Sequence, residues 1–159
     1  MRNSGLRWLW IAFFVLILDQ FSKYFISQHF ALNEPIAIFP HFNLMLAYNR
    51  GAAFNFLAAA GGWQSWLLGG LAILVACIIL FTLVRLGRSQ ILLCVALNFI
   101  LGGALGNVID RILHGHVIDF LDFYVQKWPH FPTFNLADSA ICLGAFLLIV
   151  DAIFVQKKK

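Results

Sequence analysis

Residues 66–84 read WLLGGLAILVACIILFTLV, nineteen residues without a charged side chain. A helix needs about 20 mostly apolar residues to cross the hydrocarbon core of a bilayer. Two arginines, Arg85 and Arg88, follow at once, as expected where a helix leaves the membrane. The stretch therefore predicts a membrane-spanning helix, and the rest of the chain is interpreted around it.

Three further stretches have the length and apolar character of spans, at about 8–27, 89–109 and 137–155. All four prolines lie outside the four spans, as continuous helices require. The sequence thus predicts a mainly α membrane protein with four transmembrane helices, forming a single domain over 1–159. Residues 42–48 are apolar and partly alternating, which indicates a strand between the first two spans.

The overall composition excludes several classes of protein. Hydrophobic residues make up 62% of the chain and charged residues 11%, against about 45–50% and about 25% in an average soluble domain. An ordinary cytosolic enzyme, a secreted disulfide scaffold and a disordered tail are all inconsistent with these values. The three cysteines, Cys77, Cys94 and Cys142, lie within apolar runs and are interpreted as packing residues.

The basic residues indicate how the chain is oriented. Seven of the eleven would share one side of the membrane: Arg2, Arg7, Arg85, Arg88, Lys157, Lys158 and Lys159. That side is expected to be the cytoplasm, with both termini inside. The long loops at about 28–65 and 110–136 then lie outside. Because the net charge of +4 is explained by topology, no nucleic-acid partner is expected.

Acidic residues at membrane depth are costly and mark either function or close pairing. Asp19 and Lys23 are four residues apart on one helix and are expected to form an ion pair. Asp110 precedes Arg111 at the end of the third span, where interfacial pairing between the two is expected. Asp122 is interpreted as a solvated neighbour of Asp119. Asp151, near the cytoplasmic end of the fourth span, is expected to extend its side chain to the membrane interface.

Asp119 and Asp138 have two interpretations that remain open at this point. Asp119 lies among apolar residues, and Asp138 opens the fourth span, where an acid can simply cap the helix. Alternatively, two carboxylates from a loop and a helix start could share one proton. One would then act as general base on water while the other protonates the leaving group.

The end of the third span combines small and polar residues. Gly102 and Gly106 form a small-xxx-small pattern that lets two helices approach closely. Asn107 and Arg111 share a helix face and would point toward the outer mouth beside the acids. The HxH pattern of residues 114–116 is too weak a signal for a metal site, so neither metal nor cofactor is expected.

Taken together, these segments resemble the bacterial lipoprotein signal peptidases, also called signal peptidase II. The members of this family are aspartyl endopeptidases of the inner membrane. The resemblance runs along nearly the whole chain. It rests on five blocks in the family's order: Asp19-Gln20-Phe21-Ser22-Lys23, Asn49-Arg50-Gly51-Ala52-Ala53-Phe54, Gly102 to Arg111, Gly115-His116-Val117-Ile118-Asp119-Phe120 and Phe134-Asn135-Leu136-Ala137-Asp138.

The resemblance implies a reaction and a set of roles. The family removes the signal peptide from prolipoproteins just before a diacylglyceryl-modified cysteine, and Asp119 and Asp138 match its catalytic dyad. Asp19 and Lys23 match a supporting pair in the first helix. Seven residues match positions around the active site: Asn49, Gly51, Gly103, Asn107, Arg111, Asn135 and Ala137.

The family also implies the setting of the enzyme. A small extracytoplasmic β-sheet would cradle the substrate, and the active site would face the periplasmic side of the inner membrane. Globomycin would inhibit the enzyme, which is expected to contact membrane lipid and to act as a monomer.

Two rival classes are considered beside this one. In a Ser–Lys peptidase, Lys23 would activate Ser22 or Ser139. In a small transporter or proton-conducting subunit, acids inside the spans would form an ion relay. The acids here favour the outer mouth, whereas a relay needs polar groups across the full depth of the membrane.

Overall fold

The computed structural model describes residues 4–51, 62–87, 90–124 and 132–155. Its helices are α1 (Leu9–His29), α2 (Trp63–Arg85), α3 (Ile91–His114) and α4 (Leu136–Val150). A 3-10 turn, η1 (Gly5–Trp8), precedes α1, and a π-helical turn, η3 (Asp151–Val155), follows α4. The strands are β1 (Ile36–Phe39), β2 (Phe42–Asn49) and β3 (Val117–Phe123). The predicted mainly α membrane fold is thus confirmed.

All four expected spans are present as helices long and apolar enough to cross a membrane. The boundary of the third was wrong, because α3 continues through Asp110 and Arg111 to His114 instead of ending where the charged residues begin. Charged residues near an interface do not stop a helix. Gly115 does: its φ of 73° is left-handed, and its N–H donates to the Arg111 carbonyl. The outer loop expected from residue 110 therefore starts beyond this glycine.

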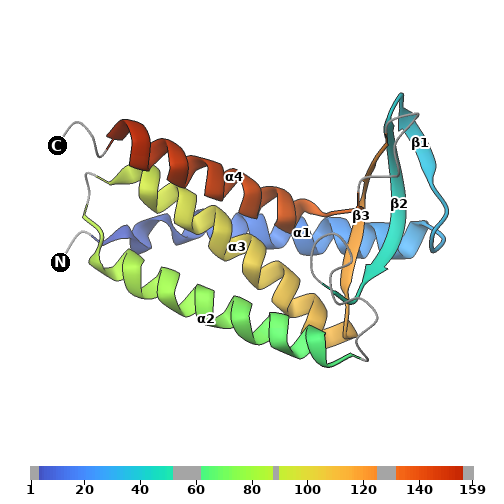
Figure 1. Ribbon diagram of the computed structural model, residues 1–159, viewed down its shortest axis with the longest axis horizontal. Coiled ribbons are helices and arrows are strands. Elements are labelled where there is room, and N and C mark those ends of the chain that lie inside the picture. The colour runs from blue at the N-terminus through green and yellow to red at the C-terminus, as the bar shows by residue number, and fades with distance from the viewer. Residues whose placement is uncertain (1–3, 52–61, 88–89, 125–131, 156–159) are drawn as a thin grey trace.

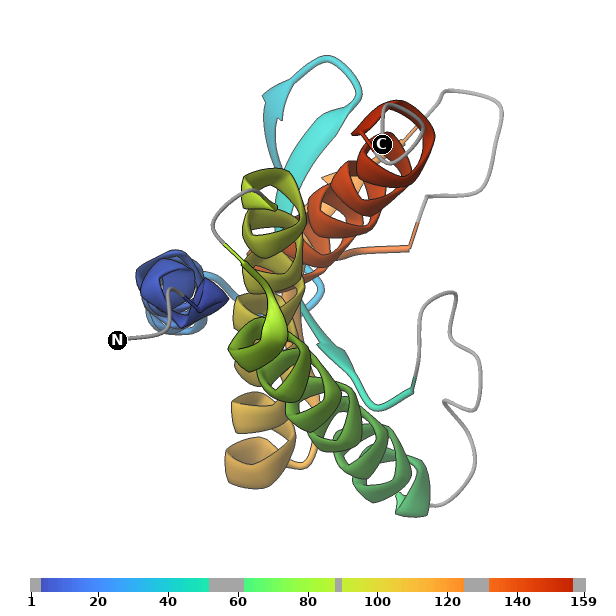
Figure 2. The same ribbon diagram turned by 90° about the vertical axis from the view of Figure 1, so that its left-hand side faces the viewer.

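Helix α3 lies at the centre of the bundle and packs against α1, α2 and α4 (Figures 1 and 2). Small residues allow these close contacts, as the glycine pattern predicted. A Cβ on Gly102 would lie 2.6 Å from the Ala12 carbonyl oxygen of α1. A Cβ on Gly103 would overlap the Ala137 carbonyl oxygen of α4. Two adjacent glycines thus bring one helix against each side of α3.

The Gly103 contact supports a prediction about stability. Gly103→Ala should destabilise the protein by about 1–3 kcal/mol, because the added methyl group would clash with the Ala137 backbone, which cannot change rotamer as a side chain can. Gly70→Ala in α2 is the matched control, since nothing lies within 4 Å of its added Cβ. Thermal unfolding in detergent should show a lower Tm for Gly103→Ala alone. An equal Tm for both variants would contradict the close α3–α4 contact.

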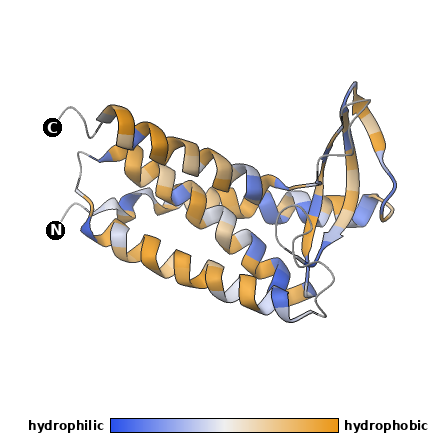
Figure 3. Cartoon of the chain, viewed as in Figure 1, coloured by the Kyte–Doolittle hydropathy of each residue, from blue (hydrophilic) through white to orange (hydrophobic). Residues whose placement is uncertain are grey.

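The outward faces of the bundle are apolar, whereas hydrophilic residues gather at the end beside the sheet (Figure 3). This pattern explains a partial error in the interpretation of the cysteines. Cys94 is buried in the core, but Cys77 and Cys142 are exposed. In a membrane helix the lipid-facing side is as apolar as the core side, so an apolar run alone does not indicate an inward direction.

The three strands form one antiparallel sheet, in the order β1-β2-β3, across one end of the bundle (Figure 1). The strand expected at 42–48 is confirmed as β2. It pairs with β3 so that Ala47 stands opposite Asp119 and Asn49 opposite Val117. The start of α1 and the end of α4 lie at the opposite end of the bundle (Figure 1).

A short return segment connects the sheet to α4. Phe134 bridges to Leu121 of β3, with N–H···O distances of 2.8 and 3.1 Å between their backbones. Helix α4 begins two residues later, at Leu136. The segment therefore brings the start of α4 beside the part of β3 that carries Asp119.

Candidate active site

Asp138 occupies the first turn of α4. Asn135 is the N-cap: its Oδ1 accepts a hydrogen bond from the Asp138 N–H at 2.9 Å, and Asp138 Oδ2 accepts one from the Asn135 N–H at 3.3 Å. This reciprocal pair is a capping box, so the interpretation of Asp138 as a first-turn acid is confirmed. Its other oxygen, Oδ1, is not used by the capping box and accepts a hydrogen bond from Asn107 Nδ2 at 2.8 Å.

Asp119 is fully buried on β3. Its two oxygens accept hydrogen bonds from Asn49 Nδ2 at 3.0 Å and from Asn135 Nδ2 at 2.7 Å. Burial, followed by the negative charge of nearby Asp138, raises the pKa of Asp119 to about 7, although the two amides oppose the shift. A carboxyl group with this pKa can hold a proton close to neutral pH.

Asn135 joins the two aspartates through one side chain. Its oxygen bonds the backbone of Asp138, and its amide nitrogen donates to Asp119 Oδ1 and, at 3.2 Å, to Asn107 Oδ1. The two carboxylates that the sequence singled out, from a strand and a helix, are thus brought together with Asn49, Asn107 and Asn135 around them.

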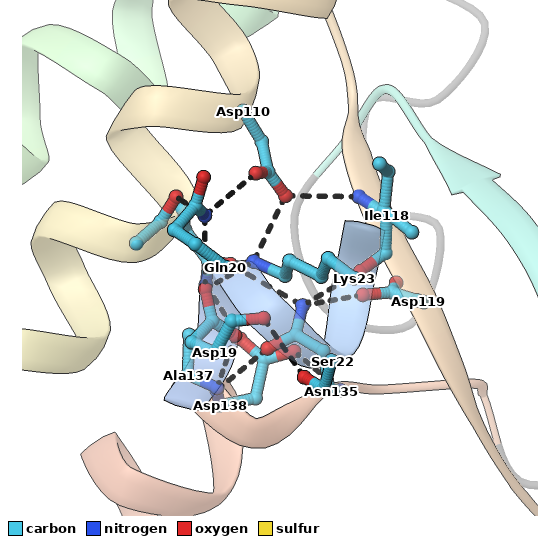
Figure 4. A network of polar contacts seen from close by, with 12 residues as sticks. Asp19, Gln20, Ser22, Lys23, Asp110, Ile118, Asp119, Asn135, Ala137 and Asp138 are labelled. Atoms are coloured by element: carbon cyan, nitrogen blue, oxygen red, sulfur yellow. Dashed lines mark hydrogen bonds and ion pairs between the residues drawn. The ribbon is translucent and has the colours of Figure 1, made fainter. Parts of the chain in front are cut away.

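A buried ionic cluster lies next to this pair (Figure 4). Lys23 Nζ stands 2.8 Å from Asp19 Oδ2 and 2.8 Å from Asp110 Oδ2. The expected Asp19–Lys23 pair is therefore confirmed. The expected pairing of Asp110 with Arg111 was wrong, because adjacent residues on a helix point about 100° apart and Asp110 faces α1.

This ionic cluster holds the backbone beside each aspartate of the pair. Asp19 Oδ1 accepts a hydrogen bond from the Ala137 N–H at 2.9 Å, one residue before Asp138. Asp110 Oδ2 accepts one from the Ile118 N–H at 3.1 Å, one residue before Asp119 (Figure 4). Asp19 and Asp110 thus fix the positions of α4 and β3 from a common base.

Gln20 is part of the same cluster, a role that was not predicted from the sequence. Its Nε2 lies 3.2 Å from Asp19 Oδ2, 3.0 Å from Asp110 Oδ1 and 3.2 Å from the Gly106 carbonyl oxygen. Its position in the sequence, directly after Asp19, could have indicated that it bonds to this acid. A polar side chain at membrane depth beside a buried acid is expected to bond to it.

The two serines of the Ser–Lys alternative bond to their own helices. Ser22 Oγ donates to the Asp19 carbonyl at 2.8 Å and Ser139 Oγ to the Asn135 carbonyl at 2.9 Å. The contacts of Lys23 are instead with Asp19, Asp110 and Asn107. This geometry does not favour a lysine-activated serine.

A cavity of about 540 Å³ opens beside Asp138. Asn49, Gly51, Asn107 and Arg111 line it, as the sequence analysis expected of active-site residues. Ser139, the serine of the Ser–Lys alternative, also lines the cavity, together with residues that the sequence did not indicate as site residues: Val117, Pro132, Thr133, Phe134, Ile141 and Cys142. Its walls are mostly apolar.

Arg111 brings a positive charge to the wall of this cavity. Its guanidinium donates to the Asn107 carbonyl at 3.2 Å and to the Gly51 carbonyl at 3.4 Å, while its Nε has no partner among the described residues. The Gly51 N–H in turn donates to Asn49 Oδ1 at 3.0 Å. A buried N–H without a partner is unfavourable, and a carbonyl oxygen of a ligand that reached it after a movement of the Arg111 side chain would satisfy it.

Three expected site residues lie behind the cavity instead of lining it. Asn135 joins the aspartates, Ala137 donates to Asp19, and Gly103 packs against Ala137. Asp119 is also absent from the lining, because the amides of Asn49 and Asn135 cover its oxygens. Asp138 is therefore the carboxylate of the pair that meets the cavity directly.

Two of the other acids were misjudged. Asp122 is buried, not solvated, and accepts a hydrogen bond from Asn43 Nδ2 at 2.8 Å across the strand pair. Asp151 is also buried, so it does not reach back to the interface. Within the described residues, no group of three or more His, Cys, Asp or Glu side chains is placed to hold a metal ion.

Comparison with known proteins identifies relatives over nearly the full chain. A family model described as signal peptidase (SPase) II matches residues 11–154. A protein named lipoprotein signal peptidase from Cronobacter sakazakii is 50% identical over 157 residues, covering 99% of this chain and 94% of its own. Its counterpart from Alteromonas mediterranea is 54% identical over 150 residues, covering 94% of this chain and 82% of its own.

Two solved bacterial membrane enzymes share the fold. One has a TM-score of 0.84 at 28% identity and covers 100% of this chain and 96% of its own. The other has a TM-score of 0.79 at 29% identity and covers 97% and 98%. With the family model spanning all four helices and the sheet, the chain belongs to the signal peptidase II family and is a multi-pass membrane peptidase.

Proposed function

We propose that the chain hydrolyses the peptide bond just before a diacylglyceryl-modified cysteine in prolipoproteins, with Asp119 and Asp138 as its catalytic dyad. The family supports the cleavage of signal peptides from lipoproteins. The observation that carries the finer proposal is the pair of carboxylates joined by Asn135, one of which opens onto a largely apolar cavity.

The environments of the two acids assign their chemical roles. Asp138 meets the cavity and is the general base, whereas Asp119 has a raised pKa of about 7 and is the general acid. Water attacks the scissile carbonyl carbon and gives its proton to Asp138, while Asp119 protonates the carbonyl oxygen. The tetrahedral intermediate then collapses: Asp138 gives its proton to the amide nitrogen, one hydroxyl of the intermediate returns a proton to Asp119, and the C–N bond breaks. The products are a carboxylic acid, which ionises in water, and an amine, and both aspartates regain their starting states.

Substrate binding exposes the general acid in this mechanism. Because Asn49 Nδ2 covers Asp119 Oδ2 at 3.0 Å, the substrate displaces that amide as it enters. Arg111 then holds a backbone carbonyl of the substrate through its unpartnered Nε–H. The diacylglyceryl chains lie along the apolar wall of the cavity, which includes Ile141 and the exposed Cys142 of α4.

The pKa of Asp119 predicts how activity depends on pH. The general acid must hold its proton, and with a pKa of about 7 it loses that proton as the pH rises. We therefore expect kcat/KM to fall with increasing pH above about 7, as read from initial rates over pH 5 to 9. Rates that are constant from pH 6 to 9 would contradict Asp119 as the acid.

The same shift predicts how stability depends on pH. The folded pKa of about 7 exceeds the ordinary value of 3.8, so the folded state binds this proton more tightly than the unfolded state does. The stabilising contribution is complete below about pH 4 and is lost as the pH rises through about 7. Asp119→Asn should remove it, which Tm measurements at pH 5 and pH 8 would show as a smaller difference than in wild type.

The setting follows from the family and from the distribution of charge. We place the enzyme in the bacterial inner membrane as one domain over 1–159, with both termini cytoplasmic and the sheet and cavity on the periplasmic side. It works there as a monomer in contact with lipid, and globomycin is expected to inhibit it. Neither nucleic acid nor a cofactor takes part.

Complementation in cells tests this function. In a bacterium depleted of its own signal peptidase II, the chain should restore processing of prolipoproteins, and globomycin should abolish that processing. Immunoblots that separate precursor from mature lipoprotein give the readout. Accumulated precursor despite normal membrane levels of the chain would contradict the proposal. The transporter alternative would then be examined by ion flux in liposomes.

A further inference from the structure

Lys23 has a third contact that its ion pairs do not explain. Its buried ammonium group lies 2.8 Å from Asp19, 2.8 Å from Asp110 and 3.0 Å from Asn107 Oδ1. An ammonium group has three N–H donors, so each has one acceptor. Two donors go to carboxylates, and the third goes to the neutral amide that also contacts Asp138.

This third contact fixes the orientation of the Asn107 amide. Asn107 Oδ1 accepts from Lys23 and, at 3.2 Å, from Asn135 Nδ2, while Asn107 Nδ2 donates to Asp138 Oδ1 at 2.8 Å. A flipped amide would turn its NH2 group toward two other donors and its oxygen toward a carboxylate. All three contacts would then be repulsive, so only one orientation is compatible with Lys23.

We infer that Lys23 is a positioning residue that orients the Asn107 amide and thereby makes Asp138 the ionised member of the dyad. The inference rests on the proposed function. An N–H donor fixed on Asp138 Oδ1 favours the carboxylate form, because that form accepts two hydrogen bonds. Asp119 accepts from Asn49 and Asn135, and among the described residues the Asn49 amide is held by one contact, from the Gly51 N–H at 3.0 Å.

The other charges near the dyad do not make this distinction. Arg111 from α3 interacts electrostatically with both Asp138 and Asp119. The charge of Lys23 also reaches Asp119. Asn107 Nδ2, which Lys23 orients through Asn107 Oδ1, donates directly to Asp138. Asn107 reaches Asp119 only indirectly, because its Oδ1 accepts from Asn135 Nδ2, which in turn donates to Asp119. The shared proton therefore resides on Asp119, on β3.

The first test is a double-mutant cycle between Lys23 and Asn107. Lys23→Met should lower kcat by about 10–100-fold with KM changed less than about twofold, because it disturbs a reacting group and not substrate binding. In an Asn107→Leu background, the same substitution should change kcat by less than about twofold. A purely structural lysine would instead reduce kcat by the same factor in both backgrounds, and that outcome would overturn the inference.

A double variant that keeps the wild-type net charge of the ionic cluster guards against misfolding. Asp19, Lys23 and Asp110 together carry one net negative charge, and Asp19→Asn combined with Lys23→Met leaves Asp110 with the same net charge. Asp19→Asn alone keeps Lys23 on Asn107. The double variant should have about 10–100-fold lower kcat than Asp19→Asn at equal folded fraction. Equal kcat values would overturn the inference.

The pH profile supplies a readout that packing alone would not move. The pH at which kcat/KM falls on the alkaline side should change in Lys23→Met. It should remain at the wild-type value in Gln20→Met, the control, which removes a donor from the same ionic cluster but no contact of Asn107. An unshifted limb in Lys23→Met would overturn the inference. Cleavage retained by Asp138→Asn would contradict the dyad itself. If Asp138→Asn is inactive but Lys23→Met keeps the wild-type kcat and an unshifted high-pH limb, the dyad stands and only this inference fails.

Discussion

Asp119→Asn and Asp138→Asn are each expected to lower kcat by about 10³-fold or more in the cleavage of a lipid-modified prolipoprotein. Asparagine has nearly the shape of aspartate but can neither take a proton from water nor supply one. Loss of either member therefore stops the transfer of protons, while the cavity stays intact. Single-turnover rates with purified protein give the measurement.

Folding has to be monitored alongside these rates. Asp119→Asn removes a buried acid whose ionisation is unfavourable, so its Tm at pH 8 should be no lower than that of wild type. A variant that is stable but inactive assigns the loss to chemistry. Cleavage within tenfold of wild type in either variant would contradict the dyad.

Asn135→Ala is expected to produce the second-largest loss, about 10²-fold or more in kcat. This one side chain donates to Asp119 and caps α4 through the Asp138 N–H, so its removal separates the two acids. The lost cap should also lower stability by about 1 kcal/mol. Rates and Tm values measured on the same preparation separate the two effects.

Asn43→Ala is the matched control for Asn135→Ala. Asn43 is likewise a buried asparagine that donates to a buried aspartate of β3, Asp122, at 2.8 Å, but the cavity does not include either residue. It should lower Tm and leave kcat within about threefold. If both variants lost kcat equally, Asn135 would have no particular role in the dyad.

Much of the fold could be predicted because the membrane simplifies the signal. Long apolar stretches, two of them free of charged residues, located all four helices. The pattern of Gly102 and Gly106 predicted close helix contacts that the structure confirms. The family resemblance and the apolar alternation of residues 42–48 were enough to anticipate the sheet. The residues expected around the active site are gathered at one end of the bundle, four of them lining the cavity.

The partners of the acids could not be predicted in the same way. Local spacing suggested Arg111 for Asp110 and solvent for Asp122, but Asp110 bonds Lys23 of α1 and Asp122 bonds Asn43 of β2. Both partners are distant in sequence, and the pairings depend on helix rotation and strand register. The bundle alone determines which face of α3 meets α1, and the β2–β3 register alone places Asn43 opposite Asp122.

The central claim is that a two-aspartate dyad cuts before a lipid-modified cysteine without a metal. It is tested most directly by incubating purified protein in detergent with synthetic prolipoprotein, with and without the diacylglyceryl group and with and without EDTA. Mass spectrometry would locate the cut. We predict cleavage just before the modified cysteine, in the lipid-modified substrate only and unaffected by EDTA. Cleavage at another bond, or cleavage abolished by EDTA, would contradict the account.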